Sequence, residues 1–135
     1  MTRKNVEFVD KVREAFNRED LRQLAEMSHD DLEFVSVFTA IDSGGATYRG
    51  PESWADYFEA IHEAWSEWQI EDFRALDVGE DRVVSLFRLI GTGRQSGVSV
   101  ERDAGLAYWL RDGKMWRVRA YLDQSQALAA VGLSE

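Results

Sequence analysis

The chain has 135 residues, a formal net charge of −9 and no cysteine. The lack of cysteine excludes a disulfide framework, a thiol nucleophile and a cysteine-ligated metal, and the acidic charge argues against nucleic-acid binding through phosphates. The length predicts one domain over residues 1–135, and without an apolar leader or roughly 20 consecutive apolar residues we expect a cytoplasmic protein that does not enter the membrane.

The N-terminal part predicts two helices. Apolar side chains recur at helical spacing over residues 5–16, which predicts the first helix. Asp20, followed three residues later by Gln23, has the pattern of a capping box and predicts a second helix over 20–28. Neither helix would be stable alone, so both are expected to cover an apolar surface.

Two strands and a loop come next. The alternation of apolar and polar residues over 31–38 predicts a strand, and Thr47-Tyr48 predicts a short return strand. Asp42 lies in the loop between them, just before a serine and two glycines. A turn residue is the interpretation that this position favours for Asp42.

A third helix is predicted over residues 51–67. Pro51 suits the first turn of a helix, where no backbone donor is needed. The apolar side chains that follow form one wide stripe, which either lines a ligand cavity or packs in the core, and the core is the favoured interpretation. The stripe consists of Trp54, Tyr57, Phe58, Ile61, Trp65 and Trp68.

The second half of the chain predicts an antiparallel sheet. Residues 69–78 form a strand with broken alternation, as at a β-bulge. Residues 82–92 are rich in branched and aromatic side chains and are expected to form the longest strand. Residues 98–102 predict a short edge strand.

The chain ends in a hairpin and a short helix. Asp112-Gly113 lies between two apolar runs and predicts a type I′ turn, in which both residues have positive φ. Asp123 reads as the N-cap of a helix over 124–131, and Gly132 as its left-handed end.

Several short motifs, in this order, resemble the SnoaL-like proteins of the NTF2-like superfamily. They are Tyr48-Arg49-Gly50-Pro51-Glu52, Asp112-Gly113-Lys114, Tyr121-Leu122-Asp123, Ala127-Leu128 and Gly132-Leu133. The resemblance implies an α+β fold: a cone-shaped half-barrel whose curved, mainly antiparallel sheet wraps around the N-terminal helices. It also implies a blind apolar pocket on the concave face of the sheet and, in many members, a second copy on the convex face.

Large apolar side chains are expected on both faces of the sheet. Phe87 and Leu89 lie on one face of their strand, and Leu86 and Ile90 lie on the other, as does Trp109 of the next strand. A sheet with one face in water alternates more cleanly than this. We therefore expect a homodimer that covers the convex face.

The stripe of the third helix and the inward faces of two strands predict one apolar cavity for a hydrophobic small molecule. A hydroxyl of Ser85 or Tyr108 is expected to orient the ligand. The expected lining is Phe34, Tyr57, Phe58, Ile61, Ser85, Phe87, Leu89, Tyr108, Val118 and Ala120.

Catalysis is less clearly indicated. Enzymes of the resembled superfamily isomerise, cyclise or hydrate small apolar molecules with a buried acid or base, but Ala120 stands where the related hydrolases and cyclases keep one such acid. Asp42 is a weak candidate for that role. His29 and His62 lack ligand spacing, and neither a metal nor a cofactor is predicted. The favoured function is binding of an apolar ligand, and the alternative is an acid–base enzyme acting on a hydrophobic, oxygenated substrate.

Overall fold

The structure, a computed structural model, describes residues 3–36, 47–79 and 81–132. Within these ranges six strands form one curled sheet in the order β2-β1-β6-β5-β4-β3. Neighbours are antiparallel except β1 and β6, which are parallel. The elements are α1 (Arg3–Arg18), α2 (Leu21–Glu26), β1 (Ser28–Val35), β2 (Thr47–Arg49), α4 (Ser53–Ala64), β3 (Trp65–Gly79), β4 (Arg82–Gly93), β5 (Ser99–Arg111), β6 (Lys114–Tyr121) and α5 (Gln124–Ala130).

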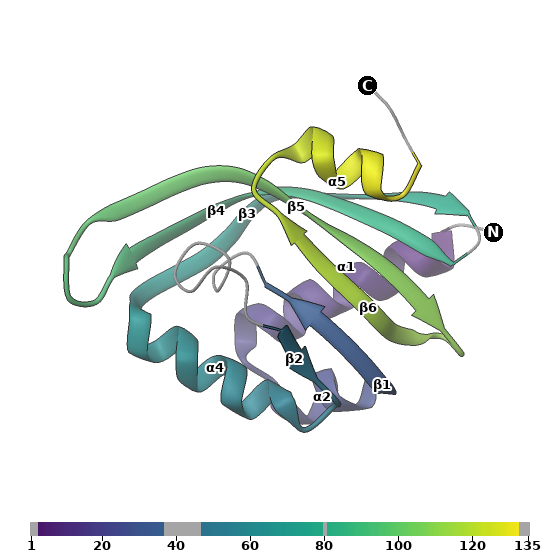
Figure 1. The fold of residues 1–135 in the computed structure, drawn as a ribbon, viewed down its shortest axis with the longest axis horizontal. Coiled ribbons are helices and arrows are strands. Elements are labelled where there is room, and N and C mark those ends of the chain that lie inside the picture. The colour runs from purple at the N-terminus through teal and green to yellow at the C-terminus, as the bar shows by residue number, and fades with distance from the viewer. Residues whose placement is uncertain (1–2, 37–46, 80, 133–135) are drawn as a thin grey trace.

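The sheet curls around one group of helices. Figure 1 shows α1, α2 and α4 on its concave side and α5 on its convex side. This is the α+β half-barrel that the sequence predicts. The two N-terminal helices are separated by Glu19, in the left-handed region with φ of 54°, and Asp20 caps α2 by accepting a hydrogen bond from the backbone N–H of Gln23 at 3.0 Å.

The main core fills the space between the helices and the concave face. Apolar side chains at helical spacing on α1 and α4 meet every second residue of β4, because side chains alternate across a strand. The most deeply buried members include Val9, Leu24, Tyr57, Ile61, Phe87 and Leu89.

A bulge in β3 changes the face of the sheet on which its side chains lie. The pairing of β3 with β4 shifts register between Glu71 and Arg74, as the broken alternation of residues 69–78 predicts. Ile70 and Phe73 line the concave cavity although they are three residues apart, a spacing that a regular strand would send to opposite faces.

The third helix is shorter than predicted. It ends at Ala64 rather than residue 67, and Trp65 already has extended backbone angles, with φ of −124° and ψ of 129°. The Trp65 ring remains buried because it packs against Gly91 on β4, where a Cβ would come within 2.7 Å of the ring. The aromatic stripe thus continues across a helix–strand junction that its spacing does not reveal.

The longest strand is β3, with 15 residues, and not β4, with 12, because the bulged β3 starts directly at the end of α4. Two strand boundaries also differ from the prediction. The first strand begins at Ser28, so the predicted helix over 20–28 ends two residues earlier, at Glu26. Residues 98–102 do not form a separate edge strand, because β5 runs without interruption from Ser99 to Arg111 and pairs with β4 along its length. The predicted hairpin turn is confirmed, since Asp112 and Gly113 both have positive φ.

The C-terminal helix explains much of the apolar convex face. A second hydrophobic cluster joins α5 to Val84 and Leu86 of β4 and Ala107 of β5. Gly105 permits this close packing, because a Cβ on it would lie 2.7 Å from the Cβ of Ala127. The convex apolar surface that motivates a dimer is thus covered in part by the chain itself.

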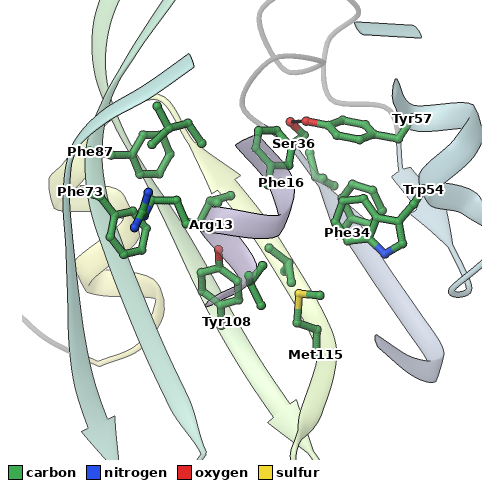
Figure 2. Close-up of a pocket in the computed structure, with 15 residues that line it drawn as sticks. Arg13, Phe16, Phe34, Ser36, Trp54, Tyr57, Phe73, Phe87, Tyr108 and Met115 are labelled. Atoms are coloured by element: carbon green, nitrogen blue, oxygen red, sulfur yellow. Dashed lines mark hydrogen bonds between the residues drawn. The ribbon is translucent and has the colours of Figure 1, made fainter. Parts of the chain in front are cut away.

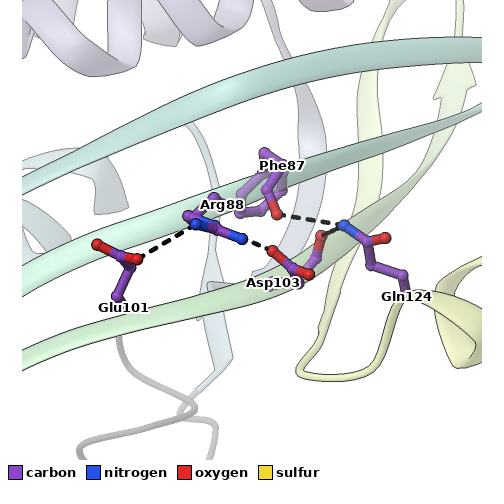
Figure 3. A network of polar contacts seen from close by, with 6 residues as sticks. Phe87, Arg88, Glu101, Asp103 and Gln124 are labelled. Carbon is purple, nitrogen blue, oxygen red and sulfur yellow. Dashed lines mark hydrogen bonds and ion pairs between the residues drawn. The ribbon is translucent and has the colours of Figure 1, made fainter.

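Polar contacts fix the start of α5 on the sheet. Asp123 accepts a hydrogen bond from the backbone N–H of Ser125 at 2.8 Å, and its bonds to Ser125 hold the pKa of the Asp123 carboxyl below its ordinary value. The side-chain amide of Gln124 donates to the backbone oxygens of Phe87 and Ala104, each at 3.3 Å (Figure 3).

Candidate functional site

A small apolar cavity lies between the concave face of the sheet and the helices. Its free volume is about 40 Å³. Figure 2 shows Tyr57 and Ser36 on one side of it and Arg13 with Phe73 on the other. The lining consists of Val12, Arg13, Phe16, Phe34, Val35, Ser36, Trp54, Tyr57, Ile70, Phe73, Phe87, Leu106, Tyr108, Met115 and Val118.

Tyr57 of α4 provides one polar group. Its hydroxyl makes a short hydrogen bond with the Ser36 hydroxyl, which follows β1. The Tyr57 ring is fully buried, with edge-on contacts to Phe34 and Tyr48 at centroid distances of 5.1 and 5.3 Å. Burial raises the pKa of Tyr57 far above its ordinary value, an effect that the Ser36 bond only partly offsets. Tyr57 is therefore a neutral hydroxyl at any physiological pH.

Tyr108 of β5 provides a second polar group. Burial also raises the pKa of its hydroxyl, and the adjacent Ser85 hydroxyl offsets this only in part. The Ser85 Oγ is buried without a hydrogen-bond partner of standard geometry among the described residues. Tyr108 itself lines the cavity.

Arg13 is the charged side chain of the described lining. Its guanidinium carbon lies 5.1 Å from the centre of the Phe73 ring. Its Nη2 and Nε donate to Asp10 Oδ1 at 2.8 and 3.3 Å. No carboxylate is found among the described lining residues, whose polar groups are hydroxyls and the guanidinium paired with Asp10.

The structure divides the ten predicted pocket residues into two groups. Phe34, Tyr57, Phe87, Tyr108 and Val118 line the cavity. Phe58, Ile61 and Leu89 lie in the core beside it, Ala120 packs against that core, and Ser85 is buried next to Tyr108. Asp42 lies outside the described residues.

Two lining residues that matter chemically, Arg13 and Phe73, are not apparent from the sequence. Arg13 is charged and gives no apolar signal, yet it lies four residues after the buried Val9, which is the spacing of one helical face. In a regular strand, Phe73 and Ile70 would lie on opposite faces, because side chains alternate. The bulge places both on the same face, and the sequence does not show where the bulge lies.

The two histidines lie outside the cavity lining. His62 Nε2 lies 2.6 Å from Glu19 Oε1, which ties the end of α4 to the turn between α1 and α2. His29 lies 3.5 Å from Asp112 Oδ2. Across the described ranges no group of three or more His, Cys, Asp or Glu side chains is arranged to hold a metal ion, and no helix there is long and apolar enough to span a bilayer.

Solved structures with this architecture cover nearly the whole chain. An NTF2-like protein from Burkholderia xenovorans is 25% identical, with a TM-score of 0.77 over 97% of both chains. A polyketide cyclase-like protein from Xanthomonas campestris is 19% identical, with a TM-score of 0.76 over 97% of this chain and 98% of that one. TerC, co-crystallised with polyporic acid, is 19% identical, with a TM-score of 0.75 over 95% and 98%.

The family comparison agrees with the fold. Among curated proteins no match is found. The SnoaL-like domain, in contrast, matches residues 9–118, from the middle of α1 to the middle of β6. This segment contains five of the six strands of the described sheet, the first part of β6 and every described lining residue of the cavity. The chain therefore belongs to the SnoaL-like family, on an NTF2-like half-barrel.

Proposed function

We propose that this protein binds a compact apolar molecule carrying a hydroxyl or carbonyl oxygen, and that it does so without acid–base turnover. The observation that carries the proposal is the cavity itself: its described lining is apolar apart from hydroxyls and the paired Arg13. Sites of this type use a few polar groups to orient a ligand that is held mainly by apolar contact.

The volume of the cavity limits the ligand. A buried water needs about 10–15 Å³ measured in this way, so about 40 Å³ is the space of roughly three water molecules. A chain of a few heavy atoms would fill it, and a single ring requires side-chain shifts, because a cavity that binds benzene has about 150 Å³. A larger molecule would have to displace part of the wall.

Tyr108 is the residue proposed to select the ligand oxygen. Tyr108 lines the cavity, and its neutral hydroxyl lies beside the buried Ser85 hydroxyl. A ligand that leaves this hydroxyl unsatisfied loses the stabilisation of one hydrogen bond. The co-crystallisation of TerC with polyporic acid supports the idea that a scaffold of this shape accommodates an organic ligand.

The alternative is an acid–base enzyme. It requires a titratable group poised near neutrality at the cavity, and Asp42 is the candidate from the sequence. Turnover of steroid enones, epoxides or polyketide esters by the wild type, abolished in Asp42→Asn, would establish the alternative in place of the binding function.

Calorimetric titration with phenol and toluene, which have similar shapes, tests the binding proposal. We expect Tyr108→Phe to weaken phenol binding by about 2- to 13-fold, the value of one net hydrogen bond, and to leave toluene binding unchanged. Tyr121→Phe is the matched control, because Tyr121 packs in the convex cluster away from the cavity. Absence of phenol binding to the wild type, or an equal loss for both ligands, would contradict the proposal.

A further inference from the structure

A second hollow lies on the outer side of the cavity wall. It is an open groove of about 370 Å³ whose walls include Asp10 and Glu14 of α1 and Phe73 and Ala75 of β3. Phe73 also lines the inner cavity. The two hollows therefore share one wall, made by a single half-buried aromatic ring.

Phe73 reaches this position because of the bulge in β3. The register shift between Glu71 and Arg74 places it on the same face as Ile70. Bulges are frequent beside functional sites, where they redirect one side chain without disturbing the rest of the sheet. At this point the sheet presents a ring that separates the cavity from the groove.

Arg13 holds that ring in place. Its guanidinium lies over Phe73 (Figure 2) and is anchored by Asp10 at 2.8 Å, with Glu14 at 3.8 Å. Arg13 lines the cavity, whereas both of its acidic partners line the groove. These contacts involve partly exposed groups and are individually weak, so a ligand can replace them.

From this arrangement we propose that the cavity and the groove are two parts of one channel, and that Phe73 under Arg13 sets the length of ligand that the channel accepts. The inference rests on the proposed function, because it requires a ligand in the cavity. The ligand class is a chain with an oxygen at Tyr108 and an apolar tail that points toward Phe73. A tail longer than the cavity would pass the ring and lie in the groove against Val6 and Ala75.

Straight-chain alcohols from butanol to decanol test the proposal. Each methylene that becomes buried raises affinity about 4-fold, so the chain length at which affinity stops rising measures the length of the site. For the wild type we expect affinity to stop rising at a short alcohol. For Phe73→Ala we expect it to stop rising at an alcohol at least two methylenes longer. Phe73→Leu, which keeps most of the packing, is expected to give an intermediate limit and covers the case in which the alanine variant fails to fold.

Leu106→Ala is the matched control. Leu106 lines the cavity but not the groove, so its truncation enlarges the cavity without opening the shared wall and should extend the limit by at most one methylene. The wild type can bind short alcohols while the Phe73 variants show the same length limit as the wild type or Leu106→Ala. In that case the channel proposal is wrong and the proposed binding function stands. If neither wild type nor any variant binds an alcohol, both proposals are overturned.

Discussion

Tyr57 and Tyr108 couple the stability of the protein to alkaline pH. Both side chains are buried, and burial raises the pKa of each above the ordinary value of 10.0. Above pH 10 the unfolded chain therefore loses these protons while the folded chain keeps them. The stabilising contribution is complete below pH 10 and decreases as the pH rises further.

Denaturant unfolding between pH 7 and pH 11.5 measures this coupling. Relative to the double variant Tyr57→Phe/Tyr108→Phe, we expect the wild type to lose about 1.4 kcal/mol per pH unit for each tyrosine above pH 10. Tyr121→Phe is the control, since Tyr121 is only partly buried. Equal alkaline slopes for the wild type and the double variant would show that these hydroxyls are not protected from ionisation.

At the scale of an element, the packing of α5 depends on one glycine. A Cβ at position 105 would lie 2.7 Å from the Ala127 Cβ and 3.2 Å from the backbone oxygen of Ser85. We expect Gly105→Ala to lower the free energy of unfolding by about 1–3 kcal/mol, the usual cost of overpacking. Chemical denaturation measures it.

A second substitution identifies the origin of that cost. Ala127→Gly in the Gly105→Ala background removes the helix side of the clash, so part of the lost stability should return despite the poorer helix propensity of glycine. If the two substitutions are simply additive, α5 does not press on the sheet at this point.

The sequence predicts elements whose signals are local. The caps at Asp20 and Asp123 and the turn at Asp112-Gly113 are all found where their own side chains and neighbours indicate. The end of α4 was not predictable in this way, because Trp65 and Trp68 keep helical spacing while their backbone is already extended. Trp65 is buried against Gly91 of β4, and the Trp68 ring packs on Phe16 and Phe58, contacts that the spacing does not reveal.

The same distinction applies to the cavity. Residues on regular stripes, such as Phe34, Phe87 and Tyr108, can be assigned to it from the sequence because the period fixes the face that they share. Leu89 and Ile61 lie on those faces too, but only the final packing decides which of them touch the cavity and which are enclosed by other side chains. Phe73 depends on a bulge whose position the sequence leaves open.

For the whole molecule, we propose a homodimer through the part of the convex face that α5 leaves open. Ile90 is half-buried there, beside Arg88, which lies 3.2 Å from both Glu101 and Asp103 (Figure 3). A strip with an apolar centre and both signs of charge is complementary to a second copy of itself related by twofold symmetry.

Sedimentation at micromolar concentration tests this assembly. We expect twice the mass of one chain for the wild type and one chain for Ile90→Glu, because a carboxylate at the centre of an interface is left unpaired. Val98→Glu is the control, since Val98 is apolar, 59% exposed and in a loop. A monomeric wild type would exclude the dimer.

The position of β6 also sets the order in which the protein can assemble. This strand is made near the end of the chain, yet it lies between β1 and β5 in the sheet. Strands β3, β4 and β5 can pair with their chain neighbours as soon as they are synthesised, whereas β1 and β2 have no sheet to join until residues 114–121 have left the ribosome. Such distant pairing slows folding, because the entropy of closing a long loop is lost before the stabilising contacts between the strands can form. The edge formed by β1 and β2 thus joins the rest of the sheet only after residues 114–121 are available.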